Sequence, residues 1–330
     1  MKHKNIAIFI PHAGCPHACS FCNQKTITAQ TKLPRAADVH RICTQAVTEI
    51  SDRRNTEIAF FGGSFTAIDR RYMLELLTAV HPFLGTDGFS GIRISTRPDC
   101  IDREVLTLLR QHGVTAIELG AQSLCEHVLA ENKRGHSVQD VQRACGLIRE
   151  YGFELGLQMM VGLYQSSIED EISTVEEIVK LHPDTVRIYP VVVLKGTVLA
   201  RLYEEGNYKL FSFAKTVELC ASALKKFHDS GISVIKCGLH ASEIVEQDML
   251  AGFYHPAFRE LCEGMVYREL IEECIGISEN KRYTIAVSPS EISKAAGHKR
   301  ENLRYFEERG ITLKLLGDRN LKKYQCEIRE

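Results

Sequence analysis

The sequence predicts an α/β fold, a partial barrel of about six to seven parallel strands with a small C-terminal α/β extension. Short apolar runs alternate with amphipathic helical patterns through the first 240 residues. Most of these runs are apolar throughout, which is typical of parallel strands that are buried on both faces and joined by crossover helices. Cysteine, glycine and polar residues follow the runs directly, as expected where an active site lies at the carboxyl ends of barrel strands.

The elements of this barrel can be placed from the pattern of apolar residues. We expect strands at residues 6–10, 57–61, 92–95, 116–119, 155–161, 186–192 and 232–235. We expect helices, with apolar residues near every third or fourth position, at residues 36–52, 70–80, 103–111, 138–151, 168–180 and 213–228. We therefore assign residues 1–240 to the barrel and residues 241–330 to the extension.

The composition is that of an ordinary globular protein. The 330 residues carry a net charge of −1, with 25% charged and 44% hydrophobic residues, so overall charge favours neither nucleic acid nor a membrane as partner. The sequence shows no signal peptide and no apolar run of about eighteen residues, and its twelve cysteines suit a reducing compartment. We therefore expect a cytoplasmic protein with no membrane partner.

Three cysteines share one loop directly after the first expected strand. Cys15, Cys19 and Cys22 form a C-x-x-x-C-x-x-C triplet, and thiolates at this spacing can reach one soft metal centre, either zinc or an iron–sulfur cluster. Structural zinc needs a fourth protein ligand, here His12, His17 or a distant cysteine, because the chain has no second C-x-x-C pair. Three ligands suit a centre with one open position. Catalytic zinc and redox-active thiols are the alternatives.

The other nine cysteines are spaced singly along the chain. We expect most of them to be small buried hydrophobic residues. Their spacing has no ligand signature, although an auxiliary cluster could take the last four: Cys237, Cys262, Cys274 and Cys326.

Glycine and arginine residues end the second and third expected strands. Gly62 and Gly63, followed by Ser64, would let a ligand approach the backbone closely, whereas a Gly-Gly pair elsewhere is usually a tight turn. Arg97 could bind a carboxylate through its guanidinium fork, or it could be a salt-bridged residue at the rim.

Polar side chains also follow the fourth and fifth expected strands. Gln122 offers a donor and an acceptor to a ribose hydroxyl, and Arg134 offers a fixed cation near a carboxylate or phosphate. The simpler readings are a helix cap and a solvated charge. Gln158 lies within an apolar run, so its amide needs partners, either in a ribose or in a neighbouring strand.

The triplet, with Phe21 directly before its last cysteine, resembles that of the radical S-adenosylmethionine (SAM) superfamily. The resemblance implies a [4Fe-4S] cluster on Cys15, Cys19 and Cys22, with one iron open to SAM. Once reduced by a donor such as flavodoxin or ferredoxin, the cluster would split SAM into methionine and a 5′-deoxyadenosyl radical. The Gly-Gly pair is similar to the motif that holds the SAM amino group. The implied cofactor-binding residues are Phe21, Gly62, Gly63, Ser64, Arg97, Gln122, Arg134 and Gln158.

A longer set of motifs resembles the radical-SAM domain of the Elongator catalytic subunit and its smaller prokaryotic relatives. The motifs are S-T-R-P-D at 95–99, E-L-G-A-Q-S at 118–123, R-G-H at 134–136, Q-M-M at 158–160, I-Y-P-V-V-V-L-K-G-T at 188–197 and G-N-Y-K at 206–209. The resemblance covers roughly residues 5–240 and implies Lys195 as a catalytic residue lining the cavity. More distantly, the triplet and the Gly-Gly pair resemble oxygen-independent coproporphyrinogen oxidase.

Two departures limit what this resemblance implies. The Elongator subunit spaces its first two cluster cysteines farther apart, and it carries an acetyltransferase domain for which these 330 residues leave no room. We therefore expect a radical SAM enzyme acting on RNA, such as tRNA, or else on a small metabolite or tetrapyrrole. A non-catalytic iron–sulfur sensor or scaffold is the alternative from another class.

The last fifty residues are basic, with twelve Lys and Arg against seven Asp and Glu. A helix, a turn around Gly297 and a second helix lie between strands expected at 282–287 and 311–315, an order that resembles the RNA-binding KH fold. Arg300 stands where the second glycine of the KH loop belongs. The extension is therefore expected to be either a substrate cap or an RNA-contacting module, whose cations would be Lys294, His298, Lys299, Arg300 and Arg304.

Overall fold

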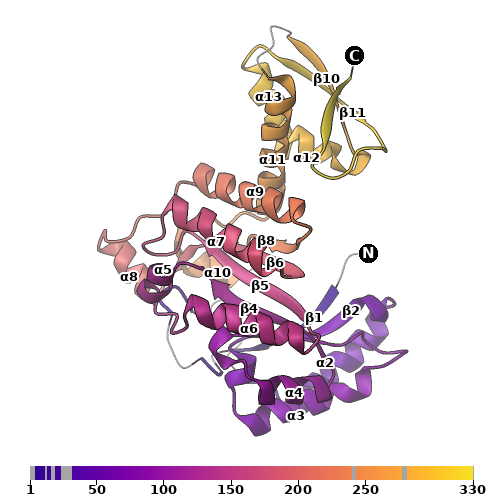
Figure 1. Cartoon of the computed structure of the whole chain (residues 1–330), viewed down its shortest axis with the longest axis vertical. Coiled ribbons are helices and arrows are strands. Elements are labelled where there is room, and N and C mark those ends of the chain that lie inside the picture. Colours follow the sequence, from indigo (N-terminus) through magenta and orange to yellow (C-terminus); the bar gives the residue numbers. More distant parts are fainter. Residues whose placement is uncertain are drawn as a thin grey trace.

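Seven parallel strands form one curled sheet, a partial barrel, in the order β1-β2-β3-β4-β5-β6-β8 (Figure 1). The computed structural model describes residues 4–11, 13–15, 19–23, 32–239, 243–276 and 281–329. The predicted fold class is confirmed. The strands are β1 (Lys4–Ile10), β2 (Thr56–Gly62), β3 (Ile92–Thr96), β4 (Val114–Gln122), β5 (Glu154–Val161), β6 (Thr185–Pro190) and β8 (Ser233–Cys237).

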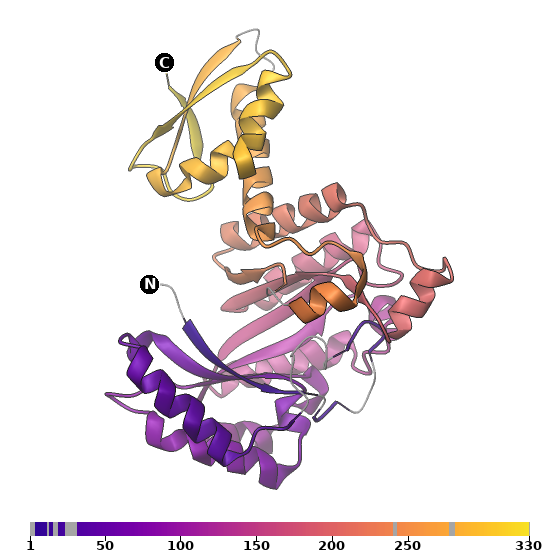
Figure 2. The same cartoon turned by 180° about the vertical axis from the view of Figure 1, so that it is seen from behind.

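Amphipathic helices follow the strands and cover the outer face of the sheet (Figures 1 and 2). Two of them begin with a capping box, in which Ser137 and Ser167 each bond the backbone N–H of an aspartate three residues later. The long helices are α2 (Ala36–Glu49), α3 (Arg70–Val80), α4 (Arg103–Gln111), α6 (Val138–Glu150), α7 (Ile168–Leu181) and α9 (Phe213–Asp229). The short ones are α5 (Glu126–Glu131), α8 (Val198–Glu204) and α10 (Glu243–Asp248).

Helix α10 lies on the opposite side of the sheet from α6 and α7, as the two views of the chain show (Figures 1 and 2). A short antiparallel pair, β7 (Val192–Leu194) with β9 (Met249–Gly252), holds the segment that carries α10 to the exit of β6. The chain after residue 240 therefore returns to the barrel before it forms the C-terminal sheet.

The C-terminal residues form a separate three-stranded sheet, β11-β10-β12, at one end of the molecule (Figure 1). The long helix α11 (Phe258–Ile275) packs on α9 and continues into this sheet. The remaining elements are β10 (Arg282–Val287), α12 (Ile292–Ala296), α13 (Glu301–Glu307), β11 (Thr312–Gly317) and β12 (Cys326–Arg329). None of the helices in the described residues combines the length and the apolar character needed to cross a membrane.

A network of buried charges connects five adjacent strands inside the barrel. The Arg93 guanidinium on β3 lies 2.7 Å from carboxylate oxygens of Glu57 on β2 and Glu154 on β5, and 3.5 Å from Glu118 on β4. Arg187 on β6 donates two hydrogen bonds, of 2.6 and 2.8 Å, to the same Glu118. Because Arg93 and Glu118 are each 1% exposed, these two charges depend on their partners.

This network predicts a large difference between two arginine substitutions. Arg93→Met leaves the buried carboxylate of Glu57 without its cation and should lower the free energy of unfolding by about 3–5 kcal/mol. The matched control is Arg103→Met, because Arg103 and its partner Glu150 are 62% and 52% exposed in their side chains, so little change is expected. Urea unfolding of the three proteins measures both effects. Equal midpoints for the two variants would contradict the role given to the network.

Candidate active site: a cavity lined by the cysteine triplet

One cavity of about 330 Å³ gathers nearly all of the predicted site residues at the carboxyl ends of the parallel strands. These residues come from the triplet loop, from the ends of β2, β3 and β4 with the turns that follow them, from β5, and from the segment after α5. The cavity is lined by Cys15, Cys19, Phe21, Cys22, Gly62, Gly63, Ser64, Arg97, Gln122, Arg134 and Gln158. Lys195 is the predicted residue that does not line it.

The cysteine loop is fixed by a buried residue that was not among the predicted site residues. Asn132 is fully buried after α5 and accepts a 2.6 Å hydrogen bond from the Ser20 hydroxyl. Its backbone carbonyl accepts the Ser20 N–H at 3.1 Å, and the Ser20 carbonyl accepts the Leu199 N–H at 2.7 Å. The residue between Cys19 and Phe21 is thus held on both sides by the barrel.

Glycines let the cysteine loop lie directly against the end of β2. A Cβ atom at Gly63 would lie 2.0 Å from the Ala13 carbonyl oxygen, and one at Gly62 would lie 2.8 Å from the Ile10 carbonyl oxygen. Gly62 also has a φ of 113°, in the region that favours glycine. From the other side, a Cβ at Gly14 would lie 2.3 Å from the Ser64 carbonyl oxygen. We call this close contact of Gly14, Gly62 and Gly63 with the neighbouring backbone the glycine cradle; it lies beside the cysteines.

Arg134 bonds the triplet itself. Its Nη1 donates to the Cys19 sulfur at 3.0 Å and its Nη2 to the Gly120 carbonyl oxygen at 2.5 Å, while the guanidinium lies 5.9 Å from the centre of the Phe21 ring. Its buried Nε has no partner among the described residues. The guanidinium thus contacts one of the three cysteines directly.

Part of the Arg97 guanidinium is already hydrogen-bonded to a neighbouring side chain. Its Nε and Nη2 each donate a 2.9 Å hydrogen bond to the carboxylate of Asp99, which occupies the fork expected to meet a ligand carboxylate. The Nη1 group takes no part in that fork. Burial raises the pKa of the Cys15 thiol, while a backbone hydrogen bond from Ser64 and the charges of Arg97 and Arg134 oppose this rise.

The two glutamines have different surroundings. Gln122 ends β4 with a φ of 69°, at a register shift against β5 that re-aims its side chain. Gln158 donates from Nε2 to the Ser95 hydroxyl at 3.1 Å and to Glu118 at 2.9 Å, so its amine is bound to neighbouring strands. Its carbonyl oxygen is the group that can accept a hydrogen bond from a ligand.

The far end of the cavity is apolar and was not predicted. It is built from the ends of β5 and β6, from β7, and from the segment around α10. Its residues are Met160, Tyr189, Pro190, Val192, Leu194, Leu239 and Val245. The sequence signal was the apolar run at 188–194, which indicates burial but does not say which cavity the side chains face.

Lys195 lies on the surface. Its Nζ donates a 2.9 Å hydrogen bond to the Gln247 carbonyl oxygen, and its own carbonyl accepts one of 3.1 Å from Asn23 in the segment after the triplet. The structure thus places its backbone near the cysteine loop and its ammonium away from the cavity lining. A catalytic role for Lys195 stays a prediction.

The thiols do not meet as ligands of one ion. Within the described residues, no three His, Cys, Asp or Glu side chains converge closely enough to hold a single metal ion. His12 and His17, the nearby alternatives for a zinc ligand, lie outside the described residues. In a cubane cluster each thiolate binds a different iron, so its cysteines lie farther apart than those around one ion.

The four distant cysteines fall into two separate places. Cys237 at the end of β8 contacts Cys220 of α9 and Cys262 of α11. Cys274 and Cys326 meet beside the C-terminal sheet. This arrangement does not favour an auxiliary cluster that uses all four late cysteines.

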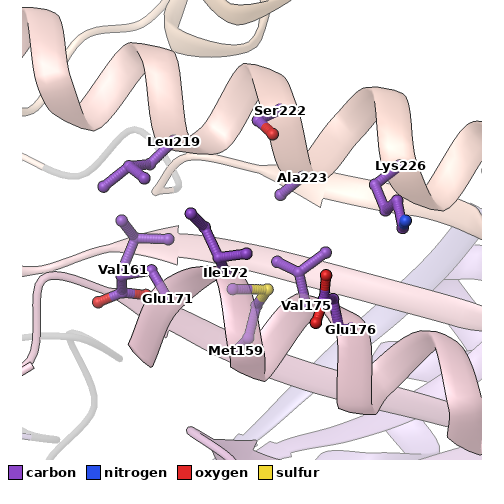
Figure 3. Close-up of a pocket in the computed structure, with 10 residues that line it drawn as sticks. All are labelled: Met159, Val161, Glu171, Ile172, Val175, Glu176, Leu219, Ser222, Ala223 and Lys226. Carbon is purple, nitrogen blue, oxygen red and sulfur yellow. The ribbon is translucent and has the colours of Figure 1, made fainter. Parts of the chain in front are cut away.

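A second, smaller cavity of about 200 Å³ lies between α7 and α9 and contains none of the predicted site residues (Figure 3). Met159 and Val161 form its floor, with Leu219 and Ala223 on α9 facing them. Glu171 at its edge accepts hydrogen bonds from the Gly162 N–H and the Ser166 hydroxyl, and burial raises its pKa to about 7. This carboxyl fixes the loop between β5 and α7.

The glycine cradle predicts the outcome of one conservative substitution. Gly63→Ala would place a methyl group against the Ala13 carbonyl oxygen, so the cysteine loop must shift, and iron content after reconstitution should fall. The matched control is Gly146→Ala on α6, where a Cβ atom meets nothing within 4 Å. Iron and sulfide analysis of both variants measures the effect. Wild-type iron content in Gly63→Ala would show that the contact does not position the loop.

Comparisons with known proteins agree with this geometry. The chain matches the Radical SAM superfamily over residues 9–178 and the Radical_SAM C-terminal domain over residues 183–268. The tRNA uridine(34) acetyltransferase of Dehalococcoides mccartyi is 28% identical over 62% of this chain and 52% of that protein. Human Elongator complex protein 3 is 31% identical over 51% of this chain and 34% of that protein. The chain thus spans about half or less of the length of these relatives.

Solved structures share the fold. The Elp3 of the archaeon Methanocaldococcus infernus, with its N-terminus deleted, superposes with a TM-score of 0.64 at 20% identity, covering 81% of this chain and 63% of that one. Coproporphyrinogen III oxidase from Escherichia coli gives 0.52 at 17% identity, covering 70% and 54%. The match over residues 9–178 spans more than half of the 330 residues, so the chain belongs to the radical SAM superfamily and is a radical SAM enzyme.

Proposed function

We propose that this enzyme holds a [4Fe-4S] cluster on Cys15, Cys19 and Cys22, binds SAM beside it and modifies a nucleoside of RNA. The observation that carries the proposal is the single cavity that gathers the triplet, the glycine cradle and the polar strand ends. When both groups are bound, the reduced cluster supplies the one-electron cleavage of SAM that leads to hydrogen abstraction from the substrate.

The residues of the cavity fit these two groups. The triplet presents three thiols on one loop without closing around a single ion, which suits a cluster with one open iron. The missing Cβ atoms at Gly62 and Gly63 let the cysteine loop pack against the end of β2, which keeps the triplet beside the strand ends that would hold SAM. The unpartnered buried Nε of Arg134 adds a donor close to the triplet.

Each side chain then has a defined task. Arg134 donates a hydrogen bond to the sulfur of Cys19, one of the three proposed cluster ligands. The Nη1 group of Arg97 is available to the SAM carboxylate, and Asp99 fixes the guanidinium plane. Gln122 and the carbonyl of Gln158 accept hydrogen bonds from the SAM ribose. The apolar end of the cavity excludes water from the reacting carbon.

The size of the cavity bears on the substrate. The cavity of the described residues measures about 330 Å³, near the lower end of the range for small-molecule sites, which favours a substrate that enters only in part. A tetrapyrrole with several carboxylates would need further cations, because the described lining contains two arginines, of which Arg97 is assigned here to SAM and Arg134 bonds Cys19 and Gly120. A single nucleoside turned out of a larger RNA would need to enter only the apolar end, which Tyr189 helps to line.

The names of the relatives and the charges of the C-terminal module support RNA as the substrate. Two of the relatives above act, by name, in tRNA uridine modification or in the Elongator complex. In the module, Lys294 lies 2.8 Å from a glutamate directly before α12 and His298 lies 3.6 Å from a glutamate of α11, so these two are engaged. Lys299, Arg300 and Arg304 are exposed and available to phosphates. The proposal covers the radical step alone, because the acetyltransferases align over only part of their length.

Mass spectrometry of RNA from a deletion strain tests the substrate. One modified nucleoside should disappear, return with the wild-type gene and with Cys125→Ser, and stay absent with Cys22→Ala. Cys125 is a half-buried cysteine outside the cavity, which makes it a matched control. Purified wild-type protein should carry about four irons per chain and release 5′-deoxyadenosine, and Cys22→Ala should do neither. An unchanged nucleoside profile would exclude the RNA substrate, and unchanged iron in Cys22→Ala would exclude the cluster site.

A further inference from the structure

Two cysteines meet at the junction between α11 and the C-terminal sheet. Cys274 lies in the last turn of α11 and Cys326 is the first residue of β12, and their sulfur atoms are 3.0 Å apart. Each thiol is also held by the backbone, since Cys274 donates to the Cys326 carbonyl oxygen and Cys326 to the Leu270 carbonyl oxygen, both at 3.4 Å. The two sulfur atoms therefore need to approach by only about 1 Å to reach the length of a disulfide bond.

We propose that Cys274 and Cys326 are an oxidative modification site that forms a reversible intramolecular disulfide. The oxidant is a low-molecular-weight disulfide such as glutathione disulfide. One thiolate attacks the small disulfide and releases one thiol, and the second cysteine then attacks the mixed disulfide and releases the other. Two protein thiols are oxidised to one disulfide, and one glutathione disulfide is reduced to two glutathiones, so electrons and protons balance.

Exposure distinguishes this pair from the other group of neighbouring thiols. Cys274 and Cys326 are half-buried, so a small oxidant can reach them. Cys220, Cys237 and Cys262 also contact one another, but they are 0%, 5% and 0% exposed beneath α9 and α11. The fold therefore protects one group of thiols and presents the other.

The bond would fix a strand that is otherwise weakly held. Strand β12 lies at the edge of the sheet, pairs with β10 through four residues, and is mostly exposed. Helix α11 packs on α9 of the barrel at its other end. A disulfide between Cys274 and Cys326 would join this edge strand covalently to the helix that carries the C-terminal module. Oxidation should therefore stabilise the sheet without touching the cavity.

Peptide mapping of the full-length holoenzyme tests the site. The protein is equilibrated anaerobically with glutathione and glutathione disulfide, its remaining thiols are alkylated, and it is digested with trypsin. Residues 269–281 and 324–329 are tryptic peptides that each contain one cysteine, so a link between them is unambiguous. We expect this linked pair, lighter than the sum of its peptides by two hydrogen atoms, and its disappearance on treatment with dithiothreitol.

Variants and hydrogen exchange separate this bond from general oxidation. Cys274→Ser and Cys326→Ser should each abolish the linked peptide, whereas Cys125→Ser should retain it, because the Cys125 sulfur faces Asp170 and Thr174 instead of another thiol. In oxidised wild-type protein, amide exchange in β10 and β12 should slow by about tenfold or more, with no change in cluster absorbance.

Two results would overturn the proposal. Wild-type protein in excess glutathione disulfide could yield only free thiols or separate glutathione adducts at these positions. A linked peptide could also form while exchange in the sheet stays at the rate of Cys326→Ser. Neither result depends on whether the enzyme acts on RNA.

Discussion

The close contact between the cysteine loop and the end of β2 is the constraint on which the site depends. Parallel strands bring their carboxyl ends to one edge, and there the loop carrying the triplet must approach a neighbouring backbone too closely for any side chain at Gly63. On its other side the same loop is fixed through Ser20 to the fully buried Asn132. The three cysteines thereby keep a defined position before any cofactor binds.

The buried charges of the barrel connect this edge to the interior. Glu118 receives both arms of Arg187 and also accepts from Gln158, which lines the cavity. A shift of the interior strands would therefore also move the Gln158 side chain in the cavity. Such fully paired networks favour one arrangement of strands, because any slip leaves a buried charge without its partner.

The sequence allowed the barrel and most of the cavity to be predicted, for identifiable reasons. Continuous apolar runs such as 155–161 specify buried parallel strands, and the strand ends carry residue types whose chemistry is informative alone. The pairing of Arg93 with three glutamates could not be predicted, because it depends on which strands are neighbours. The Arg97–Asp99 hydrogen bonds were easier to predict from the sequence, because only one residue separates the two side chains. The contact of Arg134 with Cys19 and the apolar end of the cavity at Tyr189 could not be predicted either. Both depend on how the sheet curves.

The central claim is that the triplet holds a cluster whose open iron meets SAM inside the same cavity. Electron paramagnetic resonance of the anaerobically reduced protein, recorded with and without SAM, tests this most directly. If SAM binds the cluster, the signal of the reduced [4Fe-4S] centre should change on adding SAM. The nuclear spin of a nitrogen label in the methionine part of SAM should then couple to the unpaired electron of the cluster. A spectrum that is identical with and without saturating SAM would show that the cavity does not bring the two groups together.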